Sequence, residues 1–360
     1  MKLSQNSSNR GLRVLVAGVY YFPDSMEWHV VDALRTLGAT VNMFAADTSF
    51  SETPSVIDGV RRRIRNLLAR EPERHIERRL LRTMQDFEPE LVLVILGNQI
   101  SPRTMALMRK ATRAPIVCWC QDQLTTMGRQ YILGSGYDMV FVKDRYMQEL
   151  FSRMIRSTSF RYLPEACNPR VHRPLPLSDA DRDAYGCELM IAGNLYYYRQ
   201  EILQQLSEFD LKVFGILPDW LIERIGARYQ RRAIFGDDKA RAACAARIAL
   251  NTLHFAEVNS LNCRAFELAG CGAFQMISDT PVVAEHFGVD EEIVTFRTVE
   301  ELIEKARHYL RHPEATARIA RAGQQRAHRD HTYEHRLLEL VAAVLPDRVL
   351  PGQVPPDPAP

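Results

Sequence analysis

The stretch RIALNTLHFAEVNSLNCRAFELAG, residues 247–270, combines a strand, a loop and the start of a helix. Its first part, residues 247–251, is a short apolar run that predicts a buried strand. A loop over residues 252–261 follows, and Asn262 is a residue type that favours the N-cap of a helix. Short apolar runs alternate with amphipathic stretches along the rest of the chain too. The sequence therefore predicts an α/β protein with mainly parallel sheets.

Length and composition bound the possible classes of protein. A chain of 360 residues is long enough for two domains, and 46% hydrophobic with 25% charged residues is typical of globular proteins. Lys and Arg (46) barely exceed Asp and Glu (44), so no nucleic-acid partner is expected and any anion site must be local. The seven cysteines form no CxxC pair, which predicts reduced thiols rather than disulfides or a zinc site.

The sequence also predicts a cytoplasmic protein. No stretch approaches the roughly 18 consecutive apolar residues that span a bilayer. The polar residues 1–10 lack the apolar region of a signal peptide.

Ten strands are expected, with helices between them. They are Leu12–Ala17, Thr40–Phe44, Glu90–Leu96, Pro115–Cys120, Asp138–Val142, Glu188–Ala192, Leu211–Phe214, Arg247–Asn251, Ala273–Ile277 and Ile293–Phe296. Apolar residues at helical spacing predict a helix or helix pair over Val60–Phe87 with a break before Pro72, and a last helix over Glu334–Val344.

Prolines crowd the segment from Pro164 to Pro176, which indicates an extended linker. The sequence therefore predicts two doubly wound domains, residues 1–165 and 166–345, and a disordered proline-rich tail, residues 346–360. Open α/β domains bind ligands at the carboxyl ends of their strands, so we expect function in a cleft between the two domains.

The helix that begins near Asn262 is the strongest candidate site. A helix N-terminus offers unpaired backbone N–H groups and a partial positive charge, which favour a phosphate. Arg264 in the first turn could bind a diphosphate through two parallel hydrogen bonds. Glu267 lies about 4.5 Å further along the same face and could accept hydrogen bonds from two ribose hydroxyls. The alternative interpretation is an ordinary ion pair between Arg264 and Glu267.

A second anion site is predicted where the strand over residues 188–192 ends. Gly193 and Asn194 follow that strand, and Arg199 lies where the next helix begins. Glycine permits close approach of the backbone, and a helix start favours negative charge. The alternative is a simple turn with a surface arginine.

Residues 187–336 resemble the bacterial CgeB-like glycosyltransferases of the spore-maturation type, a branch of the GT-B group with a glycosyl transferases group 1 C-terminal domain. The matching residues are Ala192-Gly193-Asn194, Tyr198-Arg199, Leu250-Asn251, Asn262 to Glu267, Gly272, Asp290-Glu291-Glu292, Glu300-Glu301-Leu302, His331-Thr332-Tyr333 and Arg336. The resemblance implies a GT-B fold, in which two Rossmann-like doubly wound domains face each other across a cleft.

The resemblance also implies an activity, the transfer of a hexosyl or related group from a nucleoside diphosphate sugar to an acceptor glycan, protein or small molecule. The N-terminal domain would bind the acceptor and the C-terminal domain the donor, without a cofactor or an essential metal. In that family Arg264 would lie near the diphosphate and Glu267 near the ribose, and Arg199 would be a second diphosphate ligand. Retaining relatives carry Glu-x7-Glu; here Asn259 replaces the first Glu, so the donor sugar and the stereochemical course stay open.

Candidates on the acceptor side follow the first and fourth strands. Gly18 ends the first strand, and the loop after it leads to a helix near Glu27. An inverting enzyme needs a general base against the acceptor hydroxyl, for which Asp24, Glu27, His29 and Asp122 are candidates. Each of these residues could instead be a cap, a surface residue or a packed side chain.

Other functions remain as alternatives. A nucleotide-sugar epimerase or a non-catalytic nucleotide-sugar-binding assembly protein would fit the same fold. The arginine-rich segment Arg61–Arg82 would suit peripheral membrane contact, an acidic acceptor or, less well, nucleic acid, although it could equally be a solvated helix face. The chain has no HExxH, GxxxxGK[ST] or GxSxG motif, which argues against metallohydrolase, P-loop and serine hydrolase chemistry.

Overall fold

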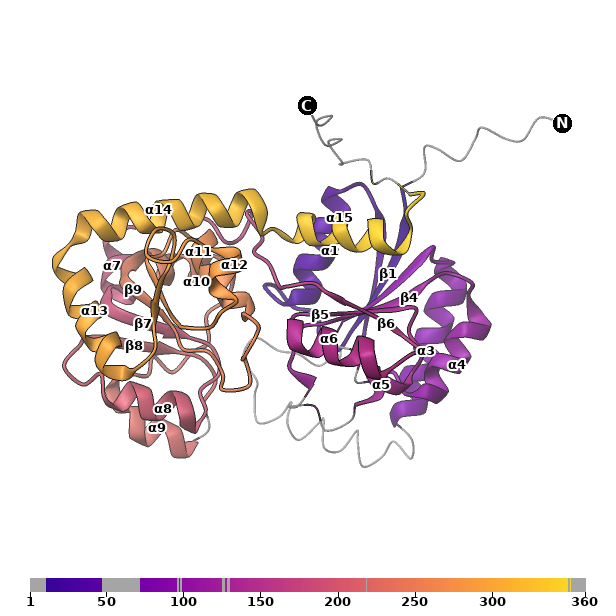
Figure 1. Ribbon diagram of the computed structural model, residues 1–360, viewed down its shortest axis with the longest axis horizontal. Helices are drawn as coiled ribbons and strands as arrows, with labels where there is room; N and C mark the ends of the chain where they lie inside the picture. The colour runs from indigo at the N-terminus through magenta and orange to yellow at the C-terminus, as the bar shows by residue number, and fades with distance from the viewer. Residues whose placement is uncertain are drawn as a thin grey trace. The chain divides into compact units, whose positions relative to one another are not determined.

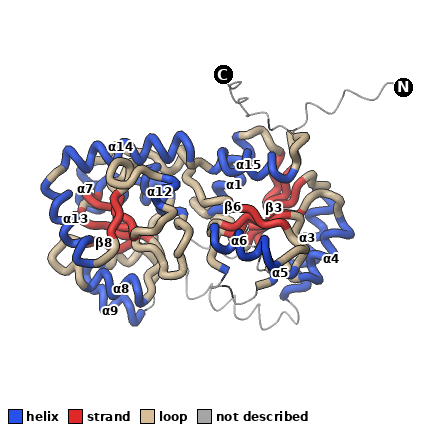
Figure 2. The backbone as a smooth tube through the Cα atoms, in the orientation of Figure 1, coloured by secondary structure: helices blue, strands red, loops and turns tan. Residues whose placement is uncertain are grey.

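The computed structural model describes residues 11–46, 72–95, 97, 99–124, 127, 130–217, 219–348 and 350. The chain divides into two compact units. The first consists of Met1–Leu163 together with Arg336–Pro360, and the second of Pro164–His335. Each unit has one parallel sheet with helices packed around it (Figures 1 and 2).

The first unit has a six-stranded parallel sheet of order β2-β1-β3-β4-β5-β6. Its elements are β1 (Arg13–Gly18), α1 (Met26–Thr36), β2 (Thr40–Ala45), α3 (Pro72–Phe87), β3 (Leu91–Ile95), α4 (Pro102–Ala111), β4 (Ile116–Cys120), α5 (Tyr131–Gly134), β5 (Met139–Val142), α6 (Arg145–Met154) and β6 (Ser159–Tyr162). Every residue of β3 and β4 is buried, as expected for central strands with helices on both faces. The strand order reverses between β1 and β3.

The second unit has a five-stranded parallel sheet of order β11-β10-β9-β7-β8. Its elements are α7 (Asp179–Tyr185), β7 (Cys187–Ala192), α8 (Tyr197–Gln204), β8 (Leu211–Phe214), α9 (Asp219–Ile225), the 3₁₀ turn η2 (Gly226–Arg228), α10 (Gly236–Ala245), β9 (Ala246–Asn251), α11 (Cys263–Gly270), β10 (Gln275–Ser278), α12 (Val283–His286), β11 (Val294–Phe296), α13 (Val299–Arg311) and α14 (Pro313–Asp330). The order reverses between β7 and β9, the point at which open α/β sheets bind ligands.

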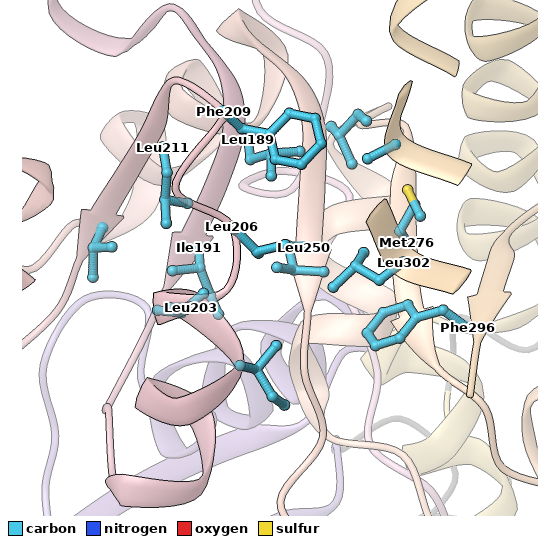
Figure 3. Packing of buried hydrophobic residues seen from close by; sticks show 14 of the residues in the cluster. Leu189, Ile191, Leu203, Leu206, Phe209, Leu211, Leu250, Met276, Phe296 and Leu302 are labelled. Atoms are coloured by element: carbon cyan, nitrogen blue, oxygen red, sulfur yellow. The ribbon is translucent and has the colours of Figure 1, made fainter. Parts of the chain in front are cut away.

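The core of the second unit shows why these segments form a parallel sheet (Figure 3). Leu189 and Ile191 of β7 pack beside Leu250 of β9, and Leu203 of α8 and Leu206, just after that helix, cover them. All five side chains are buried. Removing this apolar area from water is the main stabilising contribution to the unit.

All ten predicted strands are confirmed, each to within two residues at either end. The prediction missed one strand, β6. Its sequence SFRY contains no apolar run, and only Phe160 is buried. It is an edge strand with a single neighbour, β5. Such a strand needs fewer apolar residues than a central one.

The predicted helix over Val60–Phe87 is confirmed for its second part, because α3 begins at Pro72, where the break was expected. Residues 60–71 lie outside the described residues, as does most of the arginine run. All seven cysteines are free thiols, as predicted. Within the described residues, no helix combines the length and the apolar character needed to cross a membrane.

The end of the chain differs from the predicted division. The last helix, α15 (Tyr333–Val344), was expected to belong to the domain of residues 166–345, but residues from Arg336 onward belong to the first unit. Its apolar face, with Leu337, Leu340 and Val341, is buried. An amphipathic pattern shows that a helix is covered, not which sheet covers it. Of the predicted disordered tail, residues 346–360, only 346–348 and 350 are described, and Arg348 pairs with Glu90 of the first unit.

Candidate functional site

The start of α11 is held by a network of amide side chains. The Oδ1 atom of Asn262 accepts a hydrogen bond from the backbone N–H of Ala265 at 3.1 Å, so Asn262 is the N-cap, as predicted. Asn262 also exchanges two hydrogen bonds of 3.0 Å with Asn251, the last residue of β9. Asn251 donates to Gln275 of β10 as well, at 3.0 Å. The network fixes the helix N-terminus at the carboxyl end of β9 and ties it to Gln275, the first residue of β10.

Arg264, in the first turn of α11, lies against the backbone of Gly193. Gly193 has a φ of 113°, and a Cβ atom there would lie only 2.0 Å from Nη2 of Arg264. Only glycine therefore allows this approach. Because Gly193 follows β7 and Arg264 follows β9, the two residues meet where the strand order reverses.

Among the residues that the structure describes, no carboxylate oxygen lies within 4.0 Å of the guanidinium nitrogens of Arg264. Its Nη1 atom lies 3.4 Å from Oδ1 of Asn251. The alternative interpretation of an ion pair between Arg264 and Glu267 is therefore wrong. The guanidinium, which has no acidic partner among the described residues, and the adjacent helix N-terminus, of which the Asn262 side chain binds one N–H group, favour an anion at this position.

Arg199 of α8 is a second, buried cation, only 3% exposed. It donates from Nε to Thr252 Oγ1 at 2.7 Å, and from Nη2 to Thr252 O at 2.6 Å and to the Tyr196 hydroxyl at 3.2 Å. Nη1 donates to the carbonyl oxygen of Asn194. Burial, and then the charge of Arg264, lower the pKa of Arg199 to about 9. The alternative of a surface arginine is wrong.

These contacts define what each arginine can do. Four of the five N–H groups of Arg199 bind protein acceptors, so it ties the loop after β7 to the loop after β9 and supplies charge rather than free donors. Arg264 donates only from Nη1, to Asn251 Oδ1, among the described residues, so it keeps N–H donors for a ligand. An anion bound at Arg264 would also relieve its repulsion with Arg199.

Glu267 lies one turn further along α11 and is buried. Its Oε2 atom is 3.0 Å from Nζ of Lys239, on α10, and its Oε1 atom is 3.8 Å from Nε2 of His172. The Nδ1 atom of His172 accepts the backbone N–H of Asn168 at 2.9 Å, so its Nε2 carries the proton. Lys239 compensates the charge of the Glu267 carboxylate and orients it, and the neutral imidazole of His172 lies beside it.

The loop between β9 and α11 carries the remaining donor-side candidate. Asn259 lies half-buried in that loop, close in sequence to Ser260, whose hydroxyl donates to Glu257. Asn194, at the end of β7, is exposed, and its carbonyl oxygen accepts from Arg199.

In the first unit, Glu27 lies across the loop that follows β1. It is buried, and its Oε1 atom accepts the backbone N–H groups of Val19 at 3.3 Å and Tyr20 at 3.4 Å. A Cβ atom on Gly18 would lie 2.4 Å from Cγ of Glu27, which explains the glycine. Burial is the main cause that raises the pKa of Glu27, and the negative charge of Asp122 adds to it. The carboxyl ends of β1 and β4 thus bring Glu27 and Asp122 together.

Asp24 and His29 form a pair at the start of α1. Ser25 caps the helix, accepting the N–H of Trp28 at 3.2 Å. Asp24 has a φ of 72°, a left-handed conformation that Asp tolerates better than most residues. Its Oδ1 atom lies 2.9 Å from Nε2 of His29. A carboxylate that orients an imidazole in this way is a common arrangement for a general base.

Sequence reasoning missed several residues of these sites. Thr252 follows directly after Asn251, and its place at a strand end was a signal that could have identified it. Lys239 gave no such signal, because it lies in an ordinary polar helix. Its partner on another helix becomes visible only in three dimensions.

Residues 199–342 match the family model described as glycosyl transferase-like, a region that contains Arg199, Arg264 and Glu267. No curated protein matches the sequence. Solved structures with a similar fold include the sucrose-phosphate synthase of Thermosynechococcus elongatus, with a TM-score of 0.65, 11% identity and coverage of 92% of this chain and 98% of that one.

Two further solved structures are similar. The HepE protein of Anabaena, in complex with UDP and glucose, has a TM-score of 0.62 and 11% identity, covering 92% of this chain and 100% of that one. The trehalose 6-phosphate synthase of Burkholderia multivorans has a TM-score of 0.60 and 13% identity, with coverage of 93% and 96%. The protein therefore has the α/β fold of GT-B glycosyltransferases, as predicted, and the comparisons support glycosyl transfer as its class of function.

Proposed function

We propose that this protein transfers a sugar from a nucleoside diphosphate sugar to an acceptor nucleophile. The observation that carries the proposal is the position of Arg264, which lies over Gly193 at the reversal of strand order, beside the N-terminus of α11 and without an acidic partner among the described residues. A diphosphate supplies the missing negative charge. HepE, of similar fold, was solved with UDP and with UDP-glucose.

The same geometry suggests how the leaving group would be stabilised. As the bond to the sugar breaks, negative charge develops on the diphosphate, and fixed donors that face it lower the barrier. Arg264 and the N–H groups of α11 would contact the diphosphate directly. Arg199, whose N–H groups bind protein acceptors, would add positive charge nearby without contacting it. Basic side chains would then supply what a metal supplies elsewhere. Glu267, oriented by Lys239, would accept hydrogen bonds from the ribose, and Asn259 would lie near the donor sugar.

On the acceptor side we propose His29, oriented by Asp24, as the general base. The pair has the short distance that such a role needs, 2.9 Å. Glu27 and Asp122 would then position the acceptor rather than deprotonate it. A variant His29→Gln should keep nucleotide binding and lose turnover.

We further propose the finer assignments that the resemblance implies, namely the CgeB-like branch, hexosyl transfer and a bacterial setting, together with the cytoplasmic location predicted from the sequence. Peripheral membrane contact would use the exposed arginines Arg74, Arg78 and Arg82 on α3. Sedimentation with phosphatidylserine vesicles, compared with neutral phosphatidylcholine vesicles, would test that contact.

The test of the proposed function is a thermal-shift screen with the uridine, guanosine and thymidine diphosphate sugars. A ligand at one hundred times its Kd adds about 2.7 kcal/mol to the free energy of unfolding, so binding should be plain. Arg264→Ala should lose that shift and most of the turnover while staying folded. Arg247→Ala, at the opposite end of β9, is the matched control and should keep both.

Two outcomes would favour other functions. If no nucleotide stabilises the protein, a non-catalytic assembly role becomes the better interpretation. If incubation with donor alone yields an epimerised sugar, the protein is an epimerase that needs no acceptor. Unchanged turnover in Arg264→Ala would remove the assignment of the diphosphate site.

A further inference from the structure

A cavity of about 400 Å³ lies in the first unit, at the carboxyl ends of β1, β2 and β3. Its volume falls within the range of small-molecule sites, about 300–1,000 Å³. Gly18 of β1 and Val94 of β3 both line it, so it occupies the point at which the strand order of this sheet reverses. Ligands of open α/β sheets bind at that point.

The wall of the cavity is mainly apolar. Phe44, Ile76, Leu80, Val94 and Ile100 contribute to it from two strands, one helix and a loop. A sugar would need a hydrogen-bond partner for nearly every hydroxyl, and an apolar wall would leave several of them unsatisfied. The cavity therefore suits an apolar skeleton better than a second carbohydrate.

The apolar wall also carries four neutral polar side chains, Gln99, Ser101, Thr104 and Tyr131, and one carboxylate. Glu77 of α3 is 8% exposed and lines the cavity. Its Oε2 atom accepts the hydroxyl of Thr104 at 3.2 Å, and its Oε1 atom lies 3.4 Å from Nη2 of Arg103. Because Arg103 already compensates the charge, the carboxylate favours a neutral hydrogen-bond donor such as a hydroxyl over a second cation.

The cavity is also close to the residues proposed for the acceptor side. Gly18 lines the cavity and lies directly against the side chain of Glu27. If the apolar part of a ligand fills the cavity, the part of the ligand that reaches Gly18 also lies close to Glu27.

We infer that this cavity binds the acceptor, and that the acceptor is an alcohol with an apolar aryl or alkyl skeleton. Glu77 accepts a hydrogen bond from an acceptor hydroxyl and positions it, and Ile76 and Leu80 cover the apolar part. The assignment of the ligand as an acceptor rests on the proposed function. Its chemistry, apolar with a hydroxyl donor, rests on the cavity alone.

The experiment uses N-phenyl-1-naphthylamine, whose fluorescence rises in apolar surroundings, as the probe of the full-length protein. We expect saturable binding that Ala46→Phe weakens at least tenfold by filling the cavity. Ala111→Phe is the matched control, because Ala46 and Ala111 are both partly buried alanines packed on the same core, and only Ala46 lines the cavity. Unsaturable binding, or equal affinity in Ala46→Phe and the native protein, would overturn the inference.

Competition tests the hydroxyl. In the native protein 4-propylphenol should displace the probe at about tenfold lower concentration than propylbenzene, since a hydrogen bond to a charged group is worth that much. Glu77→Leu should abolish the difference. Equal displacement by the two compounds in the native protein would overturn the role of Glu77, and this comparison requires no variant to fold.

The nucleotide thermal shift separates this inference from the proposed function. Nucleotide binding without phenol binding refutes the cavity inference alone. Phenol binding without nucleotide binding refutes the proposed function, and the cavity then remains a site for apolar alcohols. With both present, a product in which the sugar is attached to 4-propylphenol confirms the acceptor class.

Discussion

At the scale of single residues, the sites depend on glycines that permit close approach. Gly193 leaves room for the guanidinium of Arg264, and Gly18 leaves room for Glu27. Each glycine therefore acts through a neighbouring charged side chain rather than through its own chemistry. The two contacts determine where a positive and a negative group stand at the ends of β7 and β1.

Gly193→Ala should displace Arg264 and weaken nucleotide binding at least tenfold. The added Cβ atom clashes with Nη2, and the φ of 113° is unfavourable for alanine, so we expect a loss of roughly 1–3 kcal/mol in the free energy of unfolding as well. Gly226→Ala is the matched control, because Gly226 has a φ of 63° and open space around its Cβ position. Urea unfolding and nucleotide titration of both variants check the prediction, which fails if both lose affinity alike.

Glu27→Gln should stabilise the protein increasingly as pH rises above 4.5, the ordinary pKa of Glu. The raised pKa means that, between 4.5 and the folded-state value, the folded protein keeps a proton that the unfolded chain has released. The free energy of unfolding of the native protein therefore falls as pH rises through that window, and the variant lacks this loss.

Urea unfolding at several pH values from 4 to 8 measures the effect of Glu27→Gln. Glu149→Gln, an exposed carboxylate on α6 in the same unit, is the control. A constant difference between native protein and Glu27→Gln across this range would contradict the raised pKa.

At the scale of elements, α11 combines a cap, a cation and a carboxylate within two turns. The cap, Asn262, also holds Asn251 of β9, so the helix start and the strand end form one rigid structure. The anion site proposed here would therefore need no rearrangement of these residues on binding. Preorganisation of this kind lowers the cost of association.

Asn262→Ala should lower the free energy of unfolding by about 1–2 kcal/mol and also weaken nucleotide binding. The loss includes the amide hydrogen bonds to Asn251, which is fully buried. Ser178→Ala removes the N-cap of α7 and should cost about 1 kcal/mol without changing nucleotide affinity. Equal affinity in both variants would show that the cap of α11 has no part in binding.

The elements also show what sequence can predict. Residues 247–251 and Asn262 identified β9 and the N-cap of α11 correctly because both depend on local pattern. The partners of the charged residues were not predictable. Glu267 pairs with Lys239 rather than with Arg264, three residues away, because the fold brings α10 beside α11. The role of Arg264 in binding remains a prediction.

At the scale of the whole molecule, the first unit is made of two separate stretches of chain. The ends of the sequence, up to Leu163 and from Arg336, belong together, while the second unit is continuous. The boundary near residue 165 could be predicted from the local proline cluster alone. The return of the chain after His335 depends on contacts between segments far apart in sequence, which a single sequence does not reveal.

Leu340→Ala should destabilise the first unit, although Leu340 lies far from its other residues in sequence. Loss of a fully buried leucine costs about 2–5 kcal/mol, and hydrogen exchange should quicken in β3 and β4. Leu302→Ala, which removes an equally buried leucine of α13, should quicken exchange in β9 and β10 instead. Faster exchange in β9 and β10 of Leu340→Ala would contradict the division.

The discontinuous first unit has a consequence for synthesis on the ribosome. The continuous second unit can fold once residue 335 has left the exit tunnel, whereas the first unit must wait for Arg336 and the rest of α15. Domains usually fold in the order in which they are synthesised. Here the six-stranded sheet is made first but completes its core only after the second unit has been made, so its apolar strands stay exposed to chaperones and to aggregation until α15 has emerged.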